Sequence, residues 1–299
     1  MEETVTMREI DVDLGGPVHY ADFGGQGSPI VMIHGLGGSR LNWLAVAPAL
    51  AEHHRVYALD LIGHGQTPRA GRKATLANHR RLIDQFVERV AGEPAVLVGN
   101  STGGHLSILE AAARPENVAG LVLVDPAVPI PIRGSRLSPA SLFIAPLLVR
   151  GLGEALLMAD SRRMTSEQAV YRTLKAVSTD HTRIPADVVE AHIQGQRVRH
   201  GNRDAHIALL QTGRSLLAGN LRRSAFYAKV LRVKAPTLII HGAKDRLVPL
   251  GAVRKLVELR PDWQLDVFPD LGHVPMLEDP EGFLDVVGQW LAAQTQAAA

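Results

Sequence analysis

A series of short apolar runs limits the fold of this chain more than any other feature of its sequence. The runs are "PVHYADFG" (17–24), "PIVMIHG" (29–35), "RVYALDL" (55–61), "AVLVG" (95–99), "GLVLVD" (120–125) and "PTLIIHG" (236–242). Most are nearly continuous in Val, Ile and Leu, which is typical of strands buried on both faces of a parallel sheet. The first differs, and we interpret it as an antiparallel strand of a hairpin. Between the runs at 55–61 and 95–99, apolar residues recur at helical spacing, at Leu76, Leu82, Ile83, Phe86, Val87 and Val90. Strands that alternate with helices predict a mostly parallel sheet with helices on both faces.

The strand pattern stops after Asp125 and resumes only at "VKAPTLIIHG" (233–242). The segment between them begins with a proline-rich stretch and then has helix-start signals. These signals are "SPAS" (138–141), "TSEQ" (165–168) and "IPAD" (184–187). We therefore predict a core domain made of residues 1–128 and 233–299, and a helical cap made of residues 129–232. The cap should lie above the carboxyl ends of the strands, where open α/β sheets bind their ligands.

Composition excludes several classes of protein. The chain has no cysteine, so disulfides, cysteine zinc sites and a thiol nucleophile are ruled out. Its amino-terminal stretch is acidic and lacks the apolar segment of a secretory signal. The longest apolar stretches, such as "SLFIAPLLV" (141–149), are far shorter than the ~20 residues of a membrane-spanning helix. We expect a cytoplasmic protein without a membrane span.

Charge is distributed unevenly along the chain. The net charge is +2, but residues 130–232 hold 16 Lys and Arg against 7 Asp and Glu. Such a segment is typical of solvated helix faces, and it is also compatible with an anionic small-molecule substrate. The sequence has no zinc-finger pattern and no basic run interleaved with aromatic residues, so we expect no nucleic-acid partner. A homodimer is compatible with these features.

The stretch "GNSTGG" (99–104) has the pattern G-x-S-x-G directly after a predicted strand and directly before a predicted helix. That context is typical of a nucleophile elbow, a turn so tight that its serine adopts a strained backbone. The flanking glycines keep side chains away from the neighbouring backbone. Ser101 is therefore our candidate nucleophile.

A serine hydroxyl needs a base, and the base needs a carboxylate that fixes its tautomer. His273 in "FPDLGHVPMLEDP" follows the last predicted strand, "WQLDVF" (263–268), and comes last in the expected order of serine, acid and histidine. Asp245, just past the strand at 236–242, is our candidate acid, and Asp125, just past the strand at 120–125, is the alternative. We interpret His34, His64 and His105 as packing or hydrogen-bonding residues.

An oxyanion hole requires backbone donors near the nucleophile. The N–H group of Thr102 follows Ser101 directly. We expect the second donor in "HGLGGS" (34–39), the loop after the first parallel strand, and choose the N–H group of Leu36.

Taken in order, "VMIHGLGGS", "YALDLIGHGQT", "LVGNSTGGHLSI", "LIIHGAKDRLVP" and "FPDLGHVPMLEDP" resemble the α/β-hydrolase superfamily, in its capped branch of esterases, lactonases and carbon–carbon bond hydrolases. The resemblance covers residues 1–128 and 233–299. It implies an α/β-hydrolase fold with a mostly parallel eight-stranded sheet and a helical cap inserted after strand six. It implies a triad of Ser101, Asp245 and His273, and calls for no metal or organic cofactor.

The resemblance favours a serine hydrolase that cleaves an ester of a small to medium hydrophobic substrate through an acyl-enzyme. Dehalogenases and soluble epoxide hydrolases of this superfamily have aspartate at the elbow, so Ser101 argues against both. Asn100 resembles the elbow of the meta-cleavage-product hydrolases, which cut carbon–carbon bonds, but Val274 stands where that group usually has tryptophan. A carbon–carbon bond hydrolase is therefore the alternative, and a slow-turnover small-molecule receptor is a further one.

Overall fold

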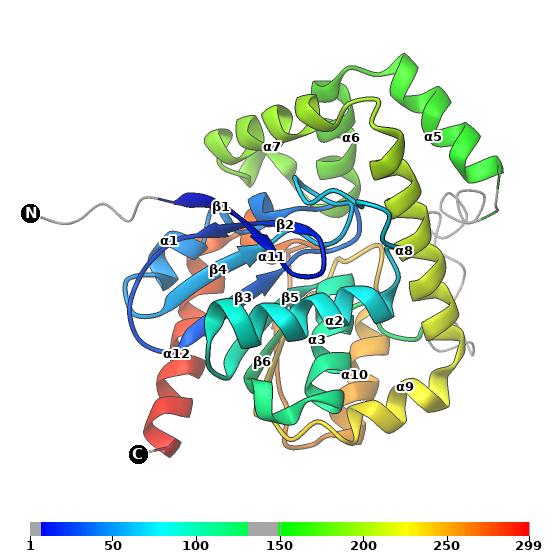
Figure 1. The fold of residues 1–299 in the computed structure, drawn as a ribbon. Helices are drawn as coiled ribbons and strands as arrows, with labels where there is room; N and C mark the ends of the chain where they lie inside the picture. The colour runs from blue at the N-terminus through cyan, green and yellow to red at the C-terminus, as the bar shows by residue number, and fades with distance from the viewer. Residues whose placement is uncertain (1–6, 131–148, 150, 299) are drawn as a thin grey trace, which may run out of the picture.

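The computed structural model describes residues 7–130, 149 and 151–298. The predicted helix start at 138–141 lies outside the described residues. Figure 1 shows a central twisted sheet with helices packed against it and a further group of helices above it. None of the described helices is long and apolar enough to cross a membrane.

The sheet in the described part of the chain has eight strands in the order β1-β2-β4-β3-β5-β6-β7-β8. Their bounds are β1 Arg8–Asp13, β2 Pro17–Asp22, β3 Pro29–Ile33, β4 Arg55–Leu59, β5 Ala95–Asn100, β6 Val118–Val124, β7 Thr237–Gly242 and β8 Gln264–Phe268. β2 pairs antiparallel with both β1 and β4, and all pairs from β4 to β8 are parallel. The predicted mostly parallel, eight-stranded sheet is confirmed, and so is the antiparallel strand near residue 20.

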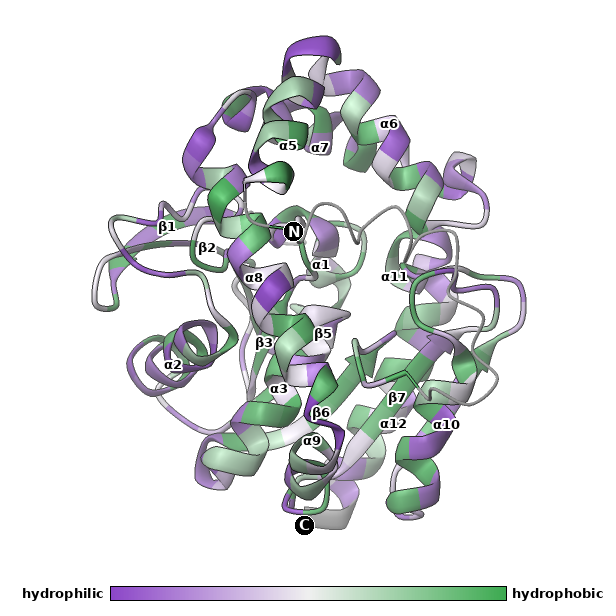
Figure 2. Cartoon of the chain, turned by 90° about the vertical axis from the view of Figure 1, so that its right-hand side faces the viewer, coloured by the Kyte–Doolittle hydropathy of each residue, from purple (hydrophilic) through white to green (hydrophobic). Residues whose placement is uncertain are grey.

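The two faces of the sheet belong to two separate hydrophobic clusters, because side chains alternate along a strand. On β3, Val31 and Ile33 point into one cluster, and Ile30 and Met32 point into the other. The first cluster is completed by α2 Leu76–Phe86, α3 Thr102–Ala113 and α10 Leu250–Leu259; the second by α1 Ala47–Leu50, α11 Pro275–Glu278 and α12 Pro280–Ala298. In Figure 2, β6, β7 and α3 carry mostly hydrophobic colour, as elements buried in these clusters should. Helices thus cover both faces, as predicted.

In the described part of the chain, five α-helices lie between β6 and β7, where the sequence predicts an insertion. They are α5 Leu152–Arg163, α6 Ser166–Val177, α7 Ala186–Arg199, α8 Arg203–Leu221 and α9 Arg223–Val230. The start signal at 165–168 is a capping box, in which the Thr165 hydroxyl accepts from the Gln168 N–H group. The signal at 184–187 also marks a helix start, but Pro185 precedes α7 without any side-chain cap.

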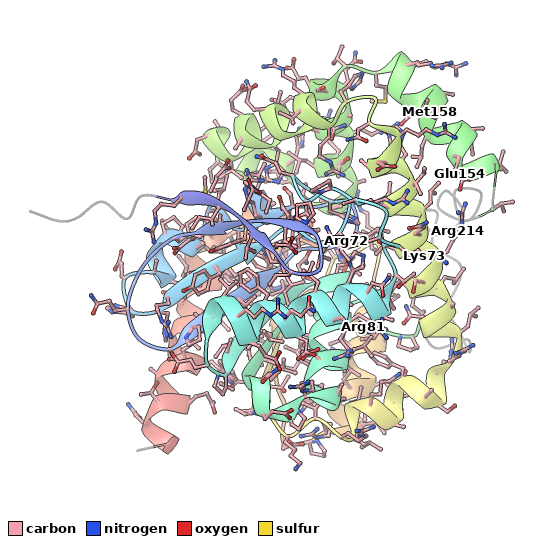
Figure 3. The ribbon with its side chains drawn as sticks, viewed as in Figure 1. Arg72, Lys73, Arg81, Glu154, Met158 and Arg214 are labelled. Carbon is pink, nitrogen blue, oxygen red and sulfur yellow. The ribbon has the colours of Figure 1, made fainter. Side chains whose placement is uncertain are left out.

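In Figure 1, α5, α6 and α7 lie above the sheet, and α8 runs down beside the core towards α9. The Val177 carbonyl accepts a hydrogen bond from the His273 N–H group at 2.7 Å, on the loop after β8. α8 contacts the segment after β4, where the Ala74 N–H group donates to Gln211 Oε1 at 2.9 Å. An ion pair between Glu154 and Arg214 joins α5 to α8, and Figure 3 shows the two side chains next to each other.

The end of the insertion packs directly on the core. Phe226 and Val230 of α9 belong to the same hydrophobic cluster as α2 and α3. The His105 ring of α3 stacks on Phe226, with ring centroids 4.8 Å apart. The division into a core of residues 1–128 and 233–299 and a cap of residues 129–232 remains a prediction, and α9 is the part of the cap that is most closely joined to the core.

Candidate active site

Ser101 occupies the turn between β5 and α3, at φ 54° and ψ −113°. Among the described residues, only Ala70, Ser101 and Asp125 combine a side chain with a positive φ. A residue other than glycine held in this region stores backbone strain, which surrounding contacts must overcome. The sequence-based expectation of a strained turn at this serine matches the geometry.

The glycines around Ser101 are required by close backbone contacts. A Cβ atom at Gly103 would lie 2.0 Å from the carbonyl oxygen of Ile33, and one at Gly99 would lie 2.5 Å from the carbonyl carbon of Gly103. Real Cβ atoms do not approach other atoms so closely. The spacing G-x-S-x-G therefore lets α3 start directly against β3 and β5.

Hydrogen bonds made by Ser101 and Asn100 hold the elbow in place. The Ser101 N–H group donates to the Val124 carbonyl at 2.9 Å, and the Ser101 carbonyl accepts from Ala127 N–H at 2.9 Å and from His105 N–H at 3.1 Å. The Asn100 side chain donates to the carbonyls of Val124 (3.2 Å) and His273 (3.1 Å). Asn100 thus joins the elbow to the loop that carries His273.

His273 and Asp245 form a close, buried pair. His273 Nδ1 lies 2.7 Å from Asp245 Oδ2; the histidine side chain is 5% exposed and the aspartate side chain is fully buried. Asp245 Oδ1 accepts from the N–H groups of Leu247 (2.6 Å) and Val248 (3.1 Å). Burial raises the pKa of Asp245, but the His273 charge and these hydrogen bonds outweigh it and leave the pKa lowered. The pair therefore consists of an anionic carboxylate beside an imidazole.

Glu278 supports the His273 loop, a role that our sequence analysis missed. Its Oε1 accepts from Gly272 N–H at 2.8 Å, and its Oε2 accepts from Thr179 N–H at 2.7 Å and Asp180 N–H at 3.2 Å. This buried carboxylate joins the residue before His273 to the loop that follows α6. An acidic residue in the apolar stretch "VPMLE" was the available signal.

The predicted oxyanion loop approaches the elbow closely. A Cβ atom at Gly35 would lie 3.1 Å from Ser101 Cβ, so the residue before Leu36 lies beside the serine. His34 Nδ1 lies 2.7 Å from the Gly35 carbonyl, and His34 Nε2 accepts from Leu61 N–H at 3.1 Å. Thr102 is the first residue of α3, where helical N–H groups lack intrahelical acceptors. The roles of Leu36 and Thr102 as oxyanion donors remain predictions.

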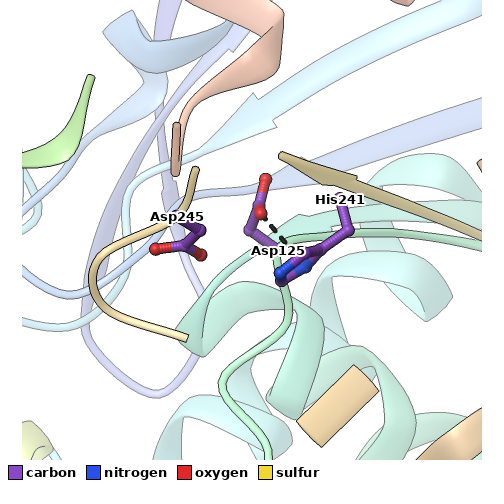
Figure 4. Close-up of side chains that lie close together, drawn as sticks. All are labelled: Asp125, His241 and Asp245. Carbon is purple, nitrogen blue, oxygen red and sulfur yellow. Dashed lines mark ion pairs between the residues drawn. The ribbon is translucent and has the colours of Figure 1, made fainter. Parts of the chain in front are cut away.

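A second carboxylate lies behind Asp245. Asp125 follows β6 and is fully buried, and its Oδ1 accepts from Gly242 N–H at 3.0 Å and lies 3.1 Å from His241 Nδ1. Figure 4 shows Asp125 between His241 and Asp245. The carboxylate in hydrogen-bond contact with His273 is Asp245, our first choice, while Asp125, the alternative, contacts Gly242 and His241.

Asp125, His241 and Asp245 also have donor types found in metal sites, and one polar atom of each lies within 4.8 Å of the others. However, both Asp245 oxygens already accept hydrogen bonds, and so does Asp125 Oδ1. We therefore interpret these three side chains as held by neighbouring backbone groups and by His273 rather than by a metal ion. His34, His64 and His105 are buried, and each has one ring nitrogen within hydrogen-bond distance of a backbone carbonyl, as a structural interpretation expects.

A cleft of about 520 Å³ lies at the junction of the core and the inserted helices. Arg69, Arg199 and Arg203 line it together with Asp204. Ser101, Asp245 and His273 are not among its lining residues. The expectation of an anionic substrate stays a prediction.

The sequence profile described as the alpha/beta hydrolase fold matches residues 28–280. The chain belongs to the α/β-hydrolase fold family. A Metapseudomonas resinovorans 2-hydroxy-6-oxo-6-(2'-aminophenyl)hexa-2,4-dienoic acid hydrolase is 29% identical and aligns over 92% of this chain and 89% of its own length. A Nitrosomonas europaea pimeloyl-[acyl-carrier protein] methyl ester esterase is also 29% identical, over 87% of this chain and 94% of its own length.

Among solved structures, a putative lipase from Acinetobacter baumannii superposes with a TM-score of 0.78 at 21% identity, covering 97% of this α/β hydrolase and 93% of the lipase chain. At that identity the likeness supports the fold alone. The predicted family and fold are confirmed, and the predicted hydrolase is confirmed at that coarse level. The two sequence relatives are named for different substrates, a dienoic acid and a methyl ester.

Proposed function

We propose that this α/β hydrolase is a serine hydrolase that cleaves an ester of a small to medium hydrophobic substrate through an acyl-enzyme. The observation that carries the proposal is the 2.7 Å contact between His273 Nδ1 and Asp245 Oδ2, on a loop that Asn100 joins to the strained Ser101 turn. A serine, a histidine and a buried carboxylate on three neighbouring loops are the parts that acyl transfer requires.

In the proposed reaction, His273 takes the Ser101 hydroxyl proton as the oxygen attacks the substrate carbonyl carbon. The N–H groups of Leu36 and Thr102 donate hydrogen bonds to the resulting oxyanion. His273 then gives the proton to the leaving alcohol, and the ester bond breaks to leave Ser101 acylated. A water that His273 deprotonates attacks the acyl group, and the carboxylic acid product is released.

Asp245 keeps the histidine in the tautomer that this reaction needs. A carboxylate that accepts from Nδ1–H leaves Nε2 free to act as a base, and it stabilises the imidazolium that forms during attack. The Leu247 and Val248 N–H groups hold this carboxylate in place. The cap of residues 129–232 would cover the acyl group and select its length.

The test is steady-state hydrolysis of p-nitrophenyl esters from acetate to octanoate by wild type and Ser101→Ala. The kcat of Ser101→Ala should be roughly 10⁶-fold lower than that of wild type, because the nucleophile and its base act together. Mass spectrometry should detect an acyl group on Ser101 of the wild type. If Ser101→Ala hydrolyses these esters as fast as wild type, the proposal is wrong.

A carbon–carbon bond hydrolase is the second candidate, because the Metapseudomonas resinovorans relative bears the name of one. Asn100, before the serine, also resembles that group. A vinylogous diketone substrate separates the two functions. Fast cleavage of the diketone with negligible ester turnover would favour this candidate, whereas a burst of acylation without steady-state turnover would favour the slow receptor.

A further inference from the structure

The Asp125 carboxyl group has one oxygen with no hydrogen-bond partner. Its side chain is fully buried, its Oδ1 accepts from Gly242 N–H at 3.0 Å, and its Oδ2 lies among the buried polar atoms without a partner. A buried carboxylate oxygen without a donor is costly, and native proteins rarely leave one. The oxygen needs either a proton of its own or a donor.

His241 does not provide that donor. Its Nε2 lies 3.1 Å from the Val248 carbonyl, which can only accept, so Nε2 carries the ring proton. Burial lowers the pKa of His241 to about 4, so the ring is neutral and Nδ1 has no proton to donate. Consistently, the contact of His241 Nδ1 with Asp125 Oδ1 at 3.1 Å does not have hydrogen-bond geometry.

The titratable groups facing Asp125 from the packed elements are His241 on β7, Asp245 on the following loop and Glu278 on α11. Asp245 is the anion of the set, since it accepts from two backbone N–H groups and faces His273. One oxygen of Asp125 and one oxygen of Asp245 lie within 4.8 Å of each other. Two buried carboxylates at this distance cannot both be ionised at low cost. Burial and then the charge of Asp245 raise the pKa of Asp125 well above its usual range.

We infer that Asp125 is a neutral carboxylic acid whose Oδ2–H group donates to Asp245, and that it positions Asp245 for His273. The inference rests on the proposed function for its kinetic consequence. Asp125 touches neither substrate nor reacting atoms, so it is a positioning residue. Because Asp125 stays protonated, Asp245 holds the single negative charge behind His273. That charge balances the one positive charge that forms on the imidazole during attack.

The backbone holds Asp125 in place for this role. Its φ is 44°, one of the strained values of the chain, and its N–H group donates to the Ile240 carbonyl at 2.9 Å. This bond, and the hydrogen bond from Gly242 N–H to Asp125 Oδ1, join the end of β6 to the end of β7. The strand pair therefore holds the Asp125 side chain beside Asp245, and one oxygen of each carboxylate lies within 4.8 Å of the other.

The kinetic test compares Asp125→Asn with Asp125→Leu in the full chain. The asparagine amide mimics the protonated acid, with its oxygen on Gly242 N–H and its NH₂ group facing Asp245. It should recover most of the activity that Asp125→Leu loses, and leave the acid limb of the pH profile of kcat/KM in place. Asp125→Leu should lose roughly 10-fold to 100-fold in kcat with little change in KM, as for one charge-assisted hydrogen bond.

The same two variants also show what to expect if Asp125 carries a negative charge. If Asp125 is ionised, Asp125→Asn removes a negative charge near His273, and the acid limb should move to lower pH by about one unit or more. That shift would overturn the inference. Equal kcat losses in both variants would overturn it too, because the conservative variant would then rescue nothing.

Infrared difference spectroscopy detects the proton on Asp125 directly. It depends neither on an activity assay nor on the Asp125→Leu variant. Wild type minus Asp125→Asn at neutral pH should contain the C=O stretch of a protonated carboxyl group, and Glu110→Gln serves to assign the band of that other buried acid. A carboxylate band in its place would contradict the inference. Zinc-dependent activity that Asp125→Asn abolishes would also contradict it, since the group would then bind a metal.

These outcomes are separable from failure of the proposed function. If wild type neither hydrolyses esters nor becomes acylated at Ser101, the proposed function fails. The infrared arm would still report whether Asp125 carries a proton.

Discussion

Gly103 shows how strongly single residues determine the geometry of the elbow. It is a helical glycine, and a methyl group in its place would lie 2.0 Å from the Ile33 carbonyl oxygen. That oxygen belongs to the end of a central strand and cannot move without breaking the sheet. The space for α3 beside β3 therefore depends on the absence of one side chain.

We predict that Gly103→Ala lowers the free energy of unfolding by about 3 kcal/mol or more through overpacking, and displaces Ser101. Gly288→Ala in α12 is the matched control, because no atom lies within 4 Å of its Cβ position. The control should be unchanged or gain up to about 1 kcal/mol from helix propensity. Urea unfolding of both variants measures this; equal stabilities for the two would refute the steric argument.

At the scale of elements, a buried ion pair joins α2 to α3. Arg80 Nη1 lies 2.8 Å from Glu110 Oε2, and the Glu110 side chain is fully buried. Burial raises the pKa of Glu110, Arg80 opposes this, and the pKa is about 7. The folded protein thus holds a proton at Glu110 over a pH range in which the unfolded chain has lost it.

This proton makes stability depend on pH in a defined direction. The contribution of Glu110 is fully present below pH 4.5 and is lost as the pH rises to about 7, on the order of 3 kcal/mol in total. Glu110→Gln, which cannot ionise, should therefore match wild type near pH 5 and be more stable near pH 8. Urea unfolding at both pH values checks this, with exposed Glu116→Gln as the control that should show no such difference.

At the scale of the whole molecule, α8 attaches the inserted helices to the core through a chain of hydrogen bonds. Thr212 Oγ1 donates to the Ala74 carbonyl at 3.1 Å and accepts from His79 Nε2–H at 3.0 Å. The Leu76 N–H group donates to Ser215 Oγ at 3.1 Å. Both Thr212 and His79 are completely buried, so water cannot replace these bonds.

Thr212→Val keeps the shape of the side chain but leaves the buried His79 N–H group and the Ala74 carbonyl without their partner. We expect a loss of about 1–3 kcal/mol in the free energy of unfolding and faster proteolysis of the inserted helices. Thr173→Val on the exposed face of α6 is the control and should change stability by less than about 0.5 kcal/mol. If the two variants are equally stable, α8 is not attached to the core in this way.

The sequence by itself determined the features that depend on neighbouring residues. Continuous Val, Ile and Leu runs identify strands buried on both faces, because only such strands exclude polar side chains from both sides. The G-x-S-x-G spacing predicted the strained turn at Ser101, because the contacts that need Gly99 and Gly103 arise within one strand–turn–helix unit and the strand beside it. The insertion after β6 was visible as an interruption of the strand pattern.

Only the tertiary structure decided which groups meet across the ends of the strands. Asp125 and Asp245 both follow strands of the sheet, and the sequence ranked Asp245 first only because its loop lies in the same part of the chain as His273. The adjacency of β6 and β7 brings both carboxylates together, and the structure places Asp245 in hydrogen-bond contact with His273. The sequence pattern did not reveal the hydrogen bonds of Glu278 and His241, because their partners lie on other elements or on irregular backbone. Contacts between distant segments set burial, and burial decides which carboxylate holds a charge and which holds a proton.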